Sequence, residues 1–396
     1  MYPRLSDFIN DLFGTNINLP IQSYGFFLAL AFLVSAWFLR SELQRKETEG
    51  LIKPRKKIIV KGEPASLLEL LTAAIVGFII GYKFIGFFIN YQYVINDTQA
   101  FLLSAQGSII GGIFAALLYS GLIYYSKNKQ KLNPPVKEEI TAHASTLVWP
   151  IVFLAVIFGI IGAKIFYWFE DWHSFIQNPL ESLLSFNGLT FYGGLIVAAI
   201  AVGVYGERNG VKWPVLADAI APSLILAYGI GRIGCQVAGD GDWGIVNLNT
   251  KPGWLSFLPD WLWAYDYPHN IINQGERIAG CVGPHCFHLA QPVFPTPIYE
   301  TLMALAIFGI LWATRKKIKI SGILASIYLM FNGMERFLIE KIRVNEKMDF
   351  LGMKLTQAEI ISSFLFLAGL LLLIYFIVKH KKNIEHGFGE NNQAGS

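Results

Sequence analysis

Charged residues are scarce in this chain. They make up 15% of its 396 residues, against roughly a quarter in ordinary soluble domains. Apolar residues make up 54%, and they recur in runs of about 20 residues, the length that spans a bilayer as a helix. The period-2 alternation of a membrane barrel is absent. The sequence therefore predicts an all-α, polytopic transmembrane protein.

Signals of several other protein classes are also missing. The net charge of +4 is spread over loops, without the basic patch that nucleic-acid binding requires. No Walker loop and no HExxH sequence occurs, so we expect no cofactor and no metal. Residues 1–20 lack a basic segment, and no cleavage site follows the first apolar run. We therefore predict no removable signal peptide.

Cysteine is rare, with three residues at Cys235, Cys281 and Cys286. Three are too few for a disulfide scaffold. Cys281 and Cys286 lie near His285 and His288, a grouping compatible with a zinc site or with a disulfide that closes a small loop. Outside the cytoplasm the disulfide is favoured, and we expect a structural role for this group.

Nine segments are predicted to span the membrane as helices. They are Ile21–Leu39, Leu67–Asn90, Phe101–Tyr125, Leu147–Phe169, Leu189–Tyr205, Trp213–Val237, Pro297–Thr314, Gly322–Ile342 and Gln357–Val378. Lys and Arg gather in every second loop between these segments, beginning with the loop after the first. The positive-inside rule places those loops in the cytoplasm. It predicts that the N-terminus lies outside and the C-terminus in the cytoplasm.

One predicted outer loop departs from this rule. Lys341 lies at the end of the eighth segment, and Arg343, Lys347 and Lys354 follow it. Single deviant loops are common, so these residues are compatible with ordinary tolerance of the rule. They are equally compatible with a cationic surface that holds an anionic headgroup.

The first half of the chain contains an internal repeat. An offset of 81 residues matches Gly81 with Gly162 and Lys83 with Lys164, so that one helix pair duplicates the next. Repeats are frequent in transporters, which keeps a membrane transporter or lipid flippase as an alternative function.

The sequence predicts six consecutive parts. They are an outer N-terminal segment with the first span and a basic loop (1–66), a duplicated two-helix unit (67–146), a second repeat unit with a signature helix, the sixth span (147–237), an extracytoplasmic loop (238–296), three C-terminal spans (297–380) and a flexible tail (381–396).

Polar side chains within the predicted spans gather toward the outer side of the membrane. Charged residues in a span are costly and usually functional. The predicted topology places the following residues in the outer half: Tyr24, Lys83, Gln106, Lys164, Tyr192, Arg232, Glu300, Arg336 and Glu340. Asp218 is the exception, near the cytoplasmic side. Lys83 and Lys164 are compatible with function, but also with long side chains that extend to the outer interface.

Two arginines stand out among these residues. Arg232 lies among glycines in the segment Tyr228–Cys235, which leaves room for the oxygens of a ligand such as phosphate. Arg336 and Glu340 are four residues apart and therefore lie on one helix face. The two residues are compatible with a simple ion pair on the helix surface. In apolar surroundings we expect Glu340 instead to orient Arg336 toward an anion.

Five segments resemble the phosphatidylglycerol–prolipoprotein diacylglyceryl transferase family, and they occur in the family's order over most of the chain. They are Ser23–Gly25, Gly188–Leu195, Gly231–Gly244, Pro295–Glu300 and Glu335–Glu340. The resemblance implies transfer of the sn-1,2-diacylglyceryl group from phosphatidylglycerol to the lipobox cysteine in the signal peptide of a prolipoprotein. The products would be a thioether and glycerol-1-phosphate. The implied location, among membrane lipids, is the outer face of the bacterial cytoplasmic (inner) membrane.

The chain departs from the family pattern at several positions. Family members usually have seven spans, and the duplicated pair raises the number to nine. Tyr192 stands where the family often has His, which removes the obvious candidate base. Cys235 replaces a common Asn, and Asp240 in the acidic position is followed by a longer turn at Gly241 and Asp242.

The expected site combines this resemblance with the positions of the polar groups. We expect Arg232 to bind the phosphate with Arg336 beside it, while Glu340 and Asp240 orient these guanidinium groups. Tyr192 completes the expected catalytic set, as a hydrogen-bonding or proton-relay group. The expected substrate-binding residues are Tyr24, Arg232, Cys235, Asp240, Gly244, Tyr299 and Glu300.

Overall fold

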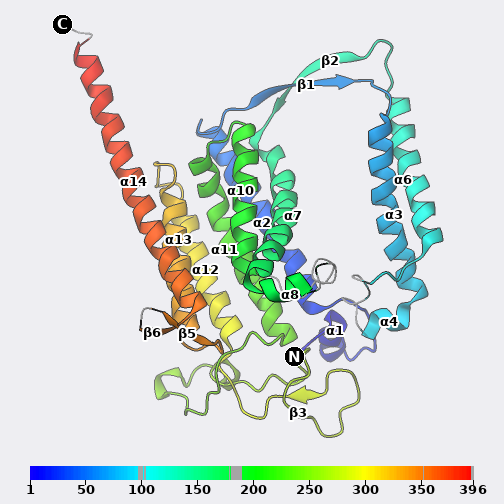
Figure 1. The fold of residues 1–396 in the computed structure, drawn as a ribbon, viewed down its shortest axis with the longest axis vertical. Coiled ribbons are helices and arrows are strands. Elements are labelled where there is room, and N and C mark those ends of the chain that lie inside the picture. The colour runs from blue at the N-terminus through cyan, green and yellow to red at the C-terminus, as the bar shows by residue number, and fades with distance from the viewer. Residues whose placement is uncertain (97–100, 102–103, 178, 180–189, 351, 394–396) are drawn as a thin grey trace. The chain divides into compact units, whose positions relative to one another are not determined.

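The computed structural model of the chain describes all residues except 97–100, 102–103, 178, 180–189, 351 and 394–396 (Figure 1). Contacts divide these residues into two compact units. The first unit comprises Met1–Pro3, Ser23–Lys53 and His143–Ser396, and the second comprises Arg4–Gln22 and Pro54–Ala142. Every residue with an expected site role belongs to the first unit.

Helices dominate both units. The helices of the first unit are α2 (Ser23–Thr48), α7 (Val148–Glu170) with the 3-10 turn η1 (Ala144–Leu147) before it, α8 (Trp172–Gln177), α10 (Phe191–Arg208), α11 (Trp213–Ala238), α12 (Thr296–Thr314), α13 (Ile323–Glu340) and α14 (Gln357–Gln393). Its loop between α11 and α12 adds the 3-10 turns η2 (Gly253–Leu255) and η3 (Asp260–Leu262). The helices of the second unit are α1 (Leu5–Phe13), α3 (Leu67–Ile89), α4 (Tyr91–Asn96) and α6 (Ile109–Lys129).

Among the described residues, seven helices are long and apolar enough to cross a membrane, and they are α2, α3, α6, α7, α11, α12 and α14. This confirms a polytopic helical membrane protein. The remaining two predicted spans correspond to α10 and α13, which have 18 residues each. Helix α13 differs from the seven because Glu335, Arg336 and Glu340 lie near its end.

Two details of the predicted fold are corrected. The span predicted from Phe101 begins later, because α6 starts at Ile109, where the Ser108 side chain accepts the N–H of Gly111 as an N-cap. The fold is also not purely helical. Its described residues form three two-stranded antiparallel sheets, which pair β1 (Arg55–Lys61) with β2 (Val136–Ala142), β3 (Glu276–Arg277) with β4 (Phe287–His288), and β5 (Lys347–Phe350) with β6 (Met353–Thr356).

These strands were hidden in the sequence because they are short and rich in charge. In addition, α14 continues to Gln393, through most of the segment 381–396 that the sequence predicts as a tail. Neither feature alters the arrangement of the spanning helices.

Helix α11 is the centre of the first unit and packs against α2, α10, α12 and α13 (Figure 1). Glycines permit these close contacts. A Cβ atom on Gly229 would lie 3.0 Å from the Ala304 Cβ of α12, and a Cβ atom on Gly234 would lie 3.0 Å from the Phe27 Cβ of α2. Arg232 lies between these two glycines, so the close packing holds its backbone between α2 and α12.

Asp218, the polar exception in the predicted spans, caps a helix. Its carboxylate accepts the backbone N–H groups of Gly322 and Ala325, each at 2.8 Å, at the start of α13. The helix dipole favours a negative charge at that end. Lys46 of α2 lies 4.0 Å from the same carboxylate. Asp218 therefore stabilises the packing of α2, α11 and α13 and is far along α11 from Arg232.

The internal repeat is visible in the contacts of two helix pairs. In the second unit, Gly81 of α3 packs against the backbone of Gly111 in α6. In the first unit, Gly162 of α7 packs in the same way against Gly193 of α10. The first helices of the pairs therefore correspond at an offset of 81 residues and the second helices at 82. A constant offset of 81 residues also predicts that Gly112 corresponds to Gly193, whereas the contacts show that Gly111 does.

Lys83 has a structural role in the second unit. Its Nζ atom donates to the carbonyl oxygens of Phe101 at 2.8 Å, Ser104 at 2.5 Å and Gln106 at 3.0 Å. The ammonium group thus organises the segment before α6 rather than extending to the membrane interface. The corresponding Lys164 is buried and lies 5.6 Å from the ring centroid of Tyr167. Residues 183–188, which correspond to 102–107 at an offset of 81, lie outside the described residues.

Candidate functional site

The loop between α11 and α12 covers one end of the first unit (Figure 1). Helix α11 ends at Gly239, whose φ of 64° is left-handed and favours glycine. The buried Tyr267 of the loop donates its hydroxyl to Gln236 in the last turn of α11 at 2.8 Å, and its ring lies 4.9 Å from that of Trp243. These contacts fix the turn that carries Asp240 and Asp242.

The loop contains a disulfide between Cys281 and Cys286. Of the two interpretations that the sequence allows for these cysteines, the structure has the disulfide. A zinc site would need both sulfurs as thiolates. The bond joins residues of the loop beside the β3–β4 hairpin.

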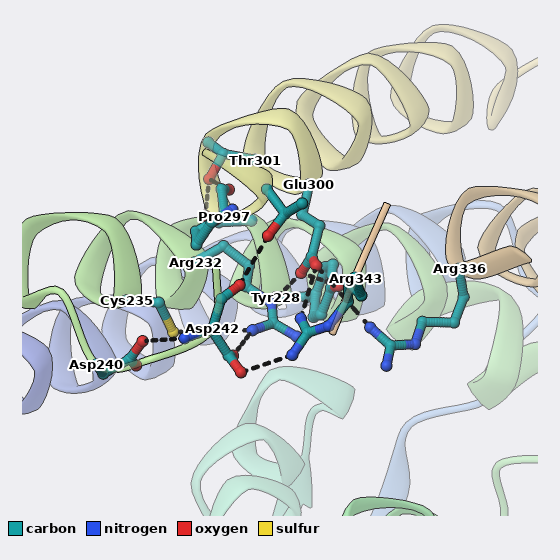
Figure 2. Close-up of polar contacts among 12 residues, drawn as sticks. Tyr228, Arg232, Cys235, Asp240, Asp242, Pro297, Glu300, Thr301, Arg336 and Arg343 are labelled. Atoms are coloured by element: carbon teal, nitrogen blue, oxygen red, sulfur yellow. Dashed lines mark hydrogen bonds and ion pairs between the residues drawn. The ribbon is translucent and has the colours of Figure 1, made fainter. Parts of the chain in front are cut away.

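Arg232 of α11 is held by two carboxylates from different parts of the chain (Figure 2). Its Nε atom pairs with Oε2 of Glu300 on α12, and its Nη1 atom pairs with Oδ2 of Asp242. The guanidinium also lies 5.1 Å from the ring centroid of Tyr228, one helical turn earlier on α11. Tyr228 donates its hydroxyl to the same Glu300 oxygen at 2.7 Å. Arg232 therefore has a fixed orientation.

Arg343 joins the same cluster, although the expected site does not include it. Its Nη1 atom lies 3.0 Å from Oε1 of Glu300, and its Nη2 atom lies 2.7 Å from Oδ1 of Asp242. Glu300 and Asp242 each bridge Arg232 and Arg343. The signal for Arg343 was present in the sequence, in the cationic outer loop after the eighth span, but spacing alone did not select it over its three lysine neighbours.

Arg336 lies beside this cluster and pairs with its helix neighbour. Its Nη2 atom is 3.1 Å from Oε2 of Glu340, as expected from their spacing on α13, and its Nη1 atom is 3.9 Å from Oε1 of Glu300. Asn345 donates to the other Glu340 oxygen at 2.5 Å. Tyr192 at the start of α10 lies next to Arg336. The structure thus brings all four residues of the expected catalytic set together.

Cys235 and Asp240 form a second group next to Arg232. The Cys235 thiol lies against the Asp240 carboxylate, and Nη1 of Arg232 is 3.9 Å from its sulfur. Tyr24 of α2 lies beside this group. We expected Asp240 to orient a guanidinium. The structure gives that role to Asp242, two residues later in the longer turn, while Asp240 faces the thiol.

Gly244 and Tyr299 serve the framework of the site. A Cβ atom on Gly244 would lie 2.5 Å from the Ile342 carbonyl oxygen, and Gly244 forms a β-bridge with Arg343. The close approach expected at Gly244 is therefore made by the protein's own backbone, and it positions Arg343. Tyr299 donates its hydroxyl to the Leu262 carbonyl at 2.6 Å and anchors the loop, outside the cluster of ion pairs.

Charge is nearly balanced around the arginines before any ligand binds. Burial tends to raise the pKa of the Asp242 carboxyl, but Arg232 and Arg343 outweigh it and hold that pKa below its usual value. Asp242 is therefore ionised at neutral pH. At Asp240 burial prevails and raises the pKa of the carboxyl. An anionic ligand must consequently compete with carboxylates for the arginines.

Among the described residues, one group could offer three ligands to a metal. The ligand atoms of Cys235, Asp240 and Asp242 all lie within 4.8 Å of one another. However, the Asp242 carboxylate already pairs with Arg232 and Arg343. Guanidinium groups this close oppose the binding of a cation by Coulomb repulsion. The arrangement is better suited to binding an anion.

Glu335 on α13 is buried beside the cluster, and neither of its carboxylate oxygens has a hydrogen-bond partner among the described residues. An unsatisfied buried polar group costs stability, and Glu300 is a like-charged neighbour. We expect Glu335→Gln to raise the free energy of unfolding by about 1 kcal/mol, measured by thermal unfolding in detergent. Glu346→Gln, at an exposed residue, should leave the free energy of unfolding unchanged. A loss of stability in Glu335→Gln would contradict this interpretation.

Comparison with known proteins identifies the family. The model of the family described as prolipoprotein diacylglyceryl transferase matches residues 124–375, well over half of the chain. The chain belongs to this family. The matched region contains the three arginines of the cluster, Glu300 and Glu340. It begins near the end of α6 and so excludes most of the second unit, including α3.

Individual relatives agree with the family model. A protein of Clostridium perfringens named phosphatidylglycerol–prolipoprotein diacylglyceryl transferase 2 is 31% identical over 239 residues, which are 59% of this chain and 80% of the relative. Proteins of Staphylococcus aureus and Corynebacterium glutamicum named phosphatidylglycerol–prolipoprotein diacylglyceryl transferase are 30% and 29% identical. Each of these two matches covers 60% of this chain, with 76% and 72% of the relatives.

Proposed function

We propose that this protein transfers the sn-1,2-diacylglyceryl group of phosphatidylglycerol to the lipobox cysteine of a prolipoprotein. Membership of the transferase family carries this proposal. The site supports it independently, because three guanidinium groups converge at one end of a membrane-embedded helix bundle. Anionic headgroups are the ligands that such a group of arginines suits best.

The reaction is a substitution at carbon. The cysteine sulfur forms a bond to the terminal glycerol carbon of the diacylglyceryl group, and the bond from that carbon to the phosphate oxygen breaks. The electron pair of the broken bond stays with glycerol-1-phosphate, and the thiol proton leaves to a base or to the departing phosphate. Two needs follow, which are stabilisation of negative charge on the phosphate and stabilisation of the thiolate.

Arg232 and Arg336 are the residues that we propose for the first need. Guanidinium groups fixed in advance stabilise developing charge without reorganising at the moment of reaction. Arg232 is fixed by Glu300 and Tyr228, and Arg336 by Glu340. Glu300 and Glu340 therefore act as positioning residues in this proposal.

The group at Cys235, Asp240 and Tyr24 is proposed to bind the headgroup next to Arg232. It lies on the side of Arg232 away from Arg336, which gives the ligand contacts on both sides. Tyr192, next to Arg336, is proposed to hydrogen-bond the ligand or to relay the thiol proton. The nearby arginines favour the thiolate form of the incoming cysteine.

The proposed topology has nine spans, with the N-terminus outside and the C-terminus in the cytoplasm of a bacterial inner membrane. The alternation of Lys and Arg between loops supports it. The site and the α11–α12 loop would then face the extracytoplasmic side, where the loop helps to shape the prolipoprotein entrance. Labelling with an impermeant maleimide tests this topology in two variants, Asp260→Cys and Lys317→Cys. The cysteine introduced at position 260 should react in intact cells, and the cysteine introduced at position 317 should react only after lysis.

The function is tested with purified protein, phosphatidylglycerol and a lipobox peptide. Mass spectrometry should detect the diacylglyceryl thioether, together with glycerol-1-phosphate in equal amount. A peptide with serine in place of the cysteine is the matched control and should stay unmodified. Absence of the thioether with a folded protein and both substrates present would refute the proposal.

The transporter or flippase alternative is not retained. The family model and each of the relatives above are named as transferases. The duplicated unit, residues 67–146, is proposed instead as an addition to a seven-span family architecture.

A further inference from the structure

Two carboxylates hold the same pair of guanidinium groups from opposite sides (Figure 2). Glu300 pairs with Nε of Arg232 and Nη1 of Arg343, and its side chain is fully buried. Asp242 pairs with Nη1 of Arg232 and Nη2 of Arg343, and its side chain is 35% exposed. Nη1 of Arg232 and Nη2 of Arg343 therefore already bind one anion, the partly exposed Asp242 carboxylate.

Glu300 is fixed in this arrangement. It lies on α12, it accepts a hydrogen bond from Tyr228, and it has no access to solvent. Breaking a buried ion pair leaves an uncompensated charge in an apolar medium. Glu300 thus stays paired with Nε of Arg232 and Nη1 of Arg343 whatever binds their other nitrogen atoms.

Asp242 is displaceable by contrast. It lies in the turn after α11, behind Gly241 with a φ of 98°, and its carboxylate reaches solvent. An ion pair that water reaches is easier to separate than a fully buried one, because water solvates the separated carboxylate. The Asp242 backbone is held by Thr296, whose hydroxyl donates to the Asp242 carbonyl at 2.7 Å. Rotation of the Asp242 side chain alone would therefore free Nη1 of Arg232 and Nη2 of Arg343, while Glu300 stays paired with both arginines.

We propose that the Asp242 carboxylate occupies the place of the phospholipid phosphate and is displaced from Arg232 and Arg343 when the headgroup binds. A phosphodiester carries one negative charge on two free oxygens, as a carboxylate does, and arginine pairs bind either group through parallel hydrogen bonds. The inference rests on the proposed function for the identity of the lipid. It adds Arg343 to the phosphate site, and it means that Asp242 competes with the phosphate for Arg232 and Arg343.

The Asp242 carboxylate also acts at the end of the reaction, when the product leaves. The product, glycerol-1-phosphate, carries more negative charge than the phosphodiester and would bind the arginines more strongly. Return of Asp242 to Arg232 and Arg343 supplies the counter-charge that they lose when the product leaves. Asp242 thus weakens substrate binding and accelerates product release.

Asp242→Asn tests this inference, because it keeps the shape of the side chain and removes its charge. We expect the KM for phosphatidylglycerol to fall roughly tenfold, a change of about 1.4 kcal/mol, and inhibition by glycerol-1-phosphate to strengthen by a similar factor. Asp242→Ser, which introduces a shorter uncharged side chain, should also lower the KM and strengthen the inhibition. Asp260→Asn is the matched control, since it removes a carboxylate from the same loop at a side chain that is 94% exposed. It should leave both constants unchanged.

A binding measurement separates this inference from the proposed function. Glycerol-1-phosphate should raise the melting temperature of Asp242→Asn at lower concentration than that of the wild-type protein. If both proteins bind it alike, or the variant binds it more weakly, the inference is wrong. If neither protein forms a thioether but the variant binds glycerol-1-phosphate more tightly, the anion site stands and the proposed function fails.

Discussion

Arg232→Ala is expected to reduce diacylglyceryl transfer by at least roughly a hundredfold to a thousandfold, the loss typical for removing one preorganised charge donor. Arg232 contacts both Glu300 and Asp242, as Arg343 does, and its guanidinium also approaches the Cys235 sulfur. Its removal takes away the charge that would stabilise the departing phosphate. The rate of thioether formation at saturating phosphatidylglycerol is the measurement that reports this loss.

Arg232→Lys refines the test, because lysine keeps the charge but cannot make two parallel hydrogen bonds. We expect it to recover only a small part of the activity. Arg336→Ala should also lose transfer while the protein folds. Arg277→Ala, in the exposed β3 strand, removes an arginine of the α11–α12 loop from outside the cluster and should be active. Near-normal turnover of Arg232→Ala would show that the phosphate binds elsewhere.

Much of the fold could be predicted from the sequence because the membrane imposes long apolar segments. Each of the nine predicted spans corresponds to a helix among the described residues. Their ends were harder to predict, as at α6, where the Ser108 cap sets the start although apolar residues also occur before it, at 101–103. The strand pairs were hard to predict for two reasons. Strands β1 and β2 are distant in sequence, and the other two pairs join strands of only two to four residues.

The residues of the site were easier to predict from the sequence than the contacts between them. Position within the spans pointed to Arg232, Arg336, Glu340 and Glu300, and the structure brings them together. The partner of Arg232 was misassigned to Asp240, because the resemblance aligns that residue with the family's acidic position. The pairing with Asp242 arises from the longer turn after Gly239, whose geometry is set by backbone conformation and by Thr296.

Arg343 shows the limit of spacing arguments. It follows the end of α13, so helical periodicity does not relate it to Arg336 or Arg232. Its position is fixed by the β-bridge to Gly244, which has no room for a side chain. The glycine of the signature and the arginine of a remote loop thus form one structural element, and only the folded chain brings them together.

Glu300→Gln is expected to lower both activity and stability. Glu300 is fully buried and compensates Arg232 and Arg343 at once, with Arg336 at 3.9 Å. The substitution keeps the size of the side chain but leaves these guanidinium groups without their buried counter-charge. Removing one partner of a buried ion pair typically costs about 3 to 5 kcal/mol. Unfolding by heat in detergent measures the loss of stability, and the thioether assay measures the loss of transfer.

Two comparisons show whether Glu300 acts through the arginines. Glu276→Gln, on an exposed glutamate of the β3 strand, should leave stability and transfer unchanged. The double variant Glu300→Gln with Arg343→Gln should be more stable than the sum of the single losses predicts, since residues in one ion-pair network couple by roughly 0.5 to 3 kcal/mol. Additive losses would mean that Glu300 and Arg343 are energetically independent. The cluster would then be a set of separate pairs, and Glu300 would not be the residue that holds the phosphate-binding arginines in place.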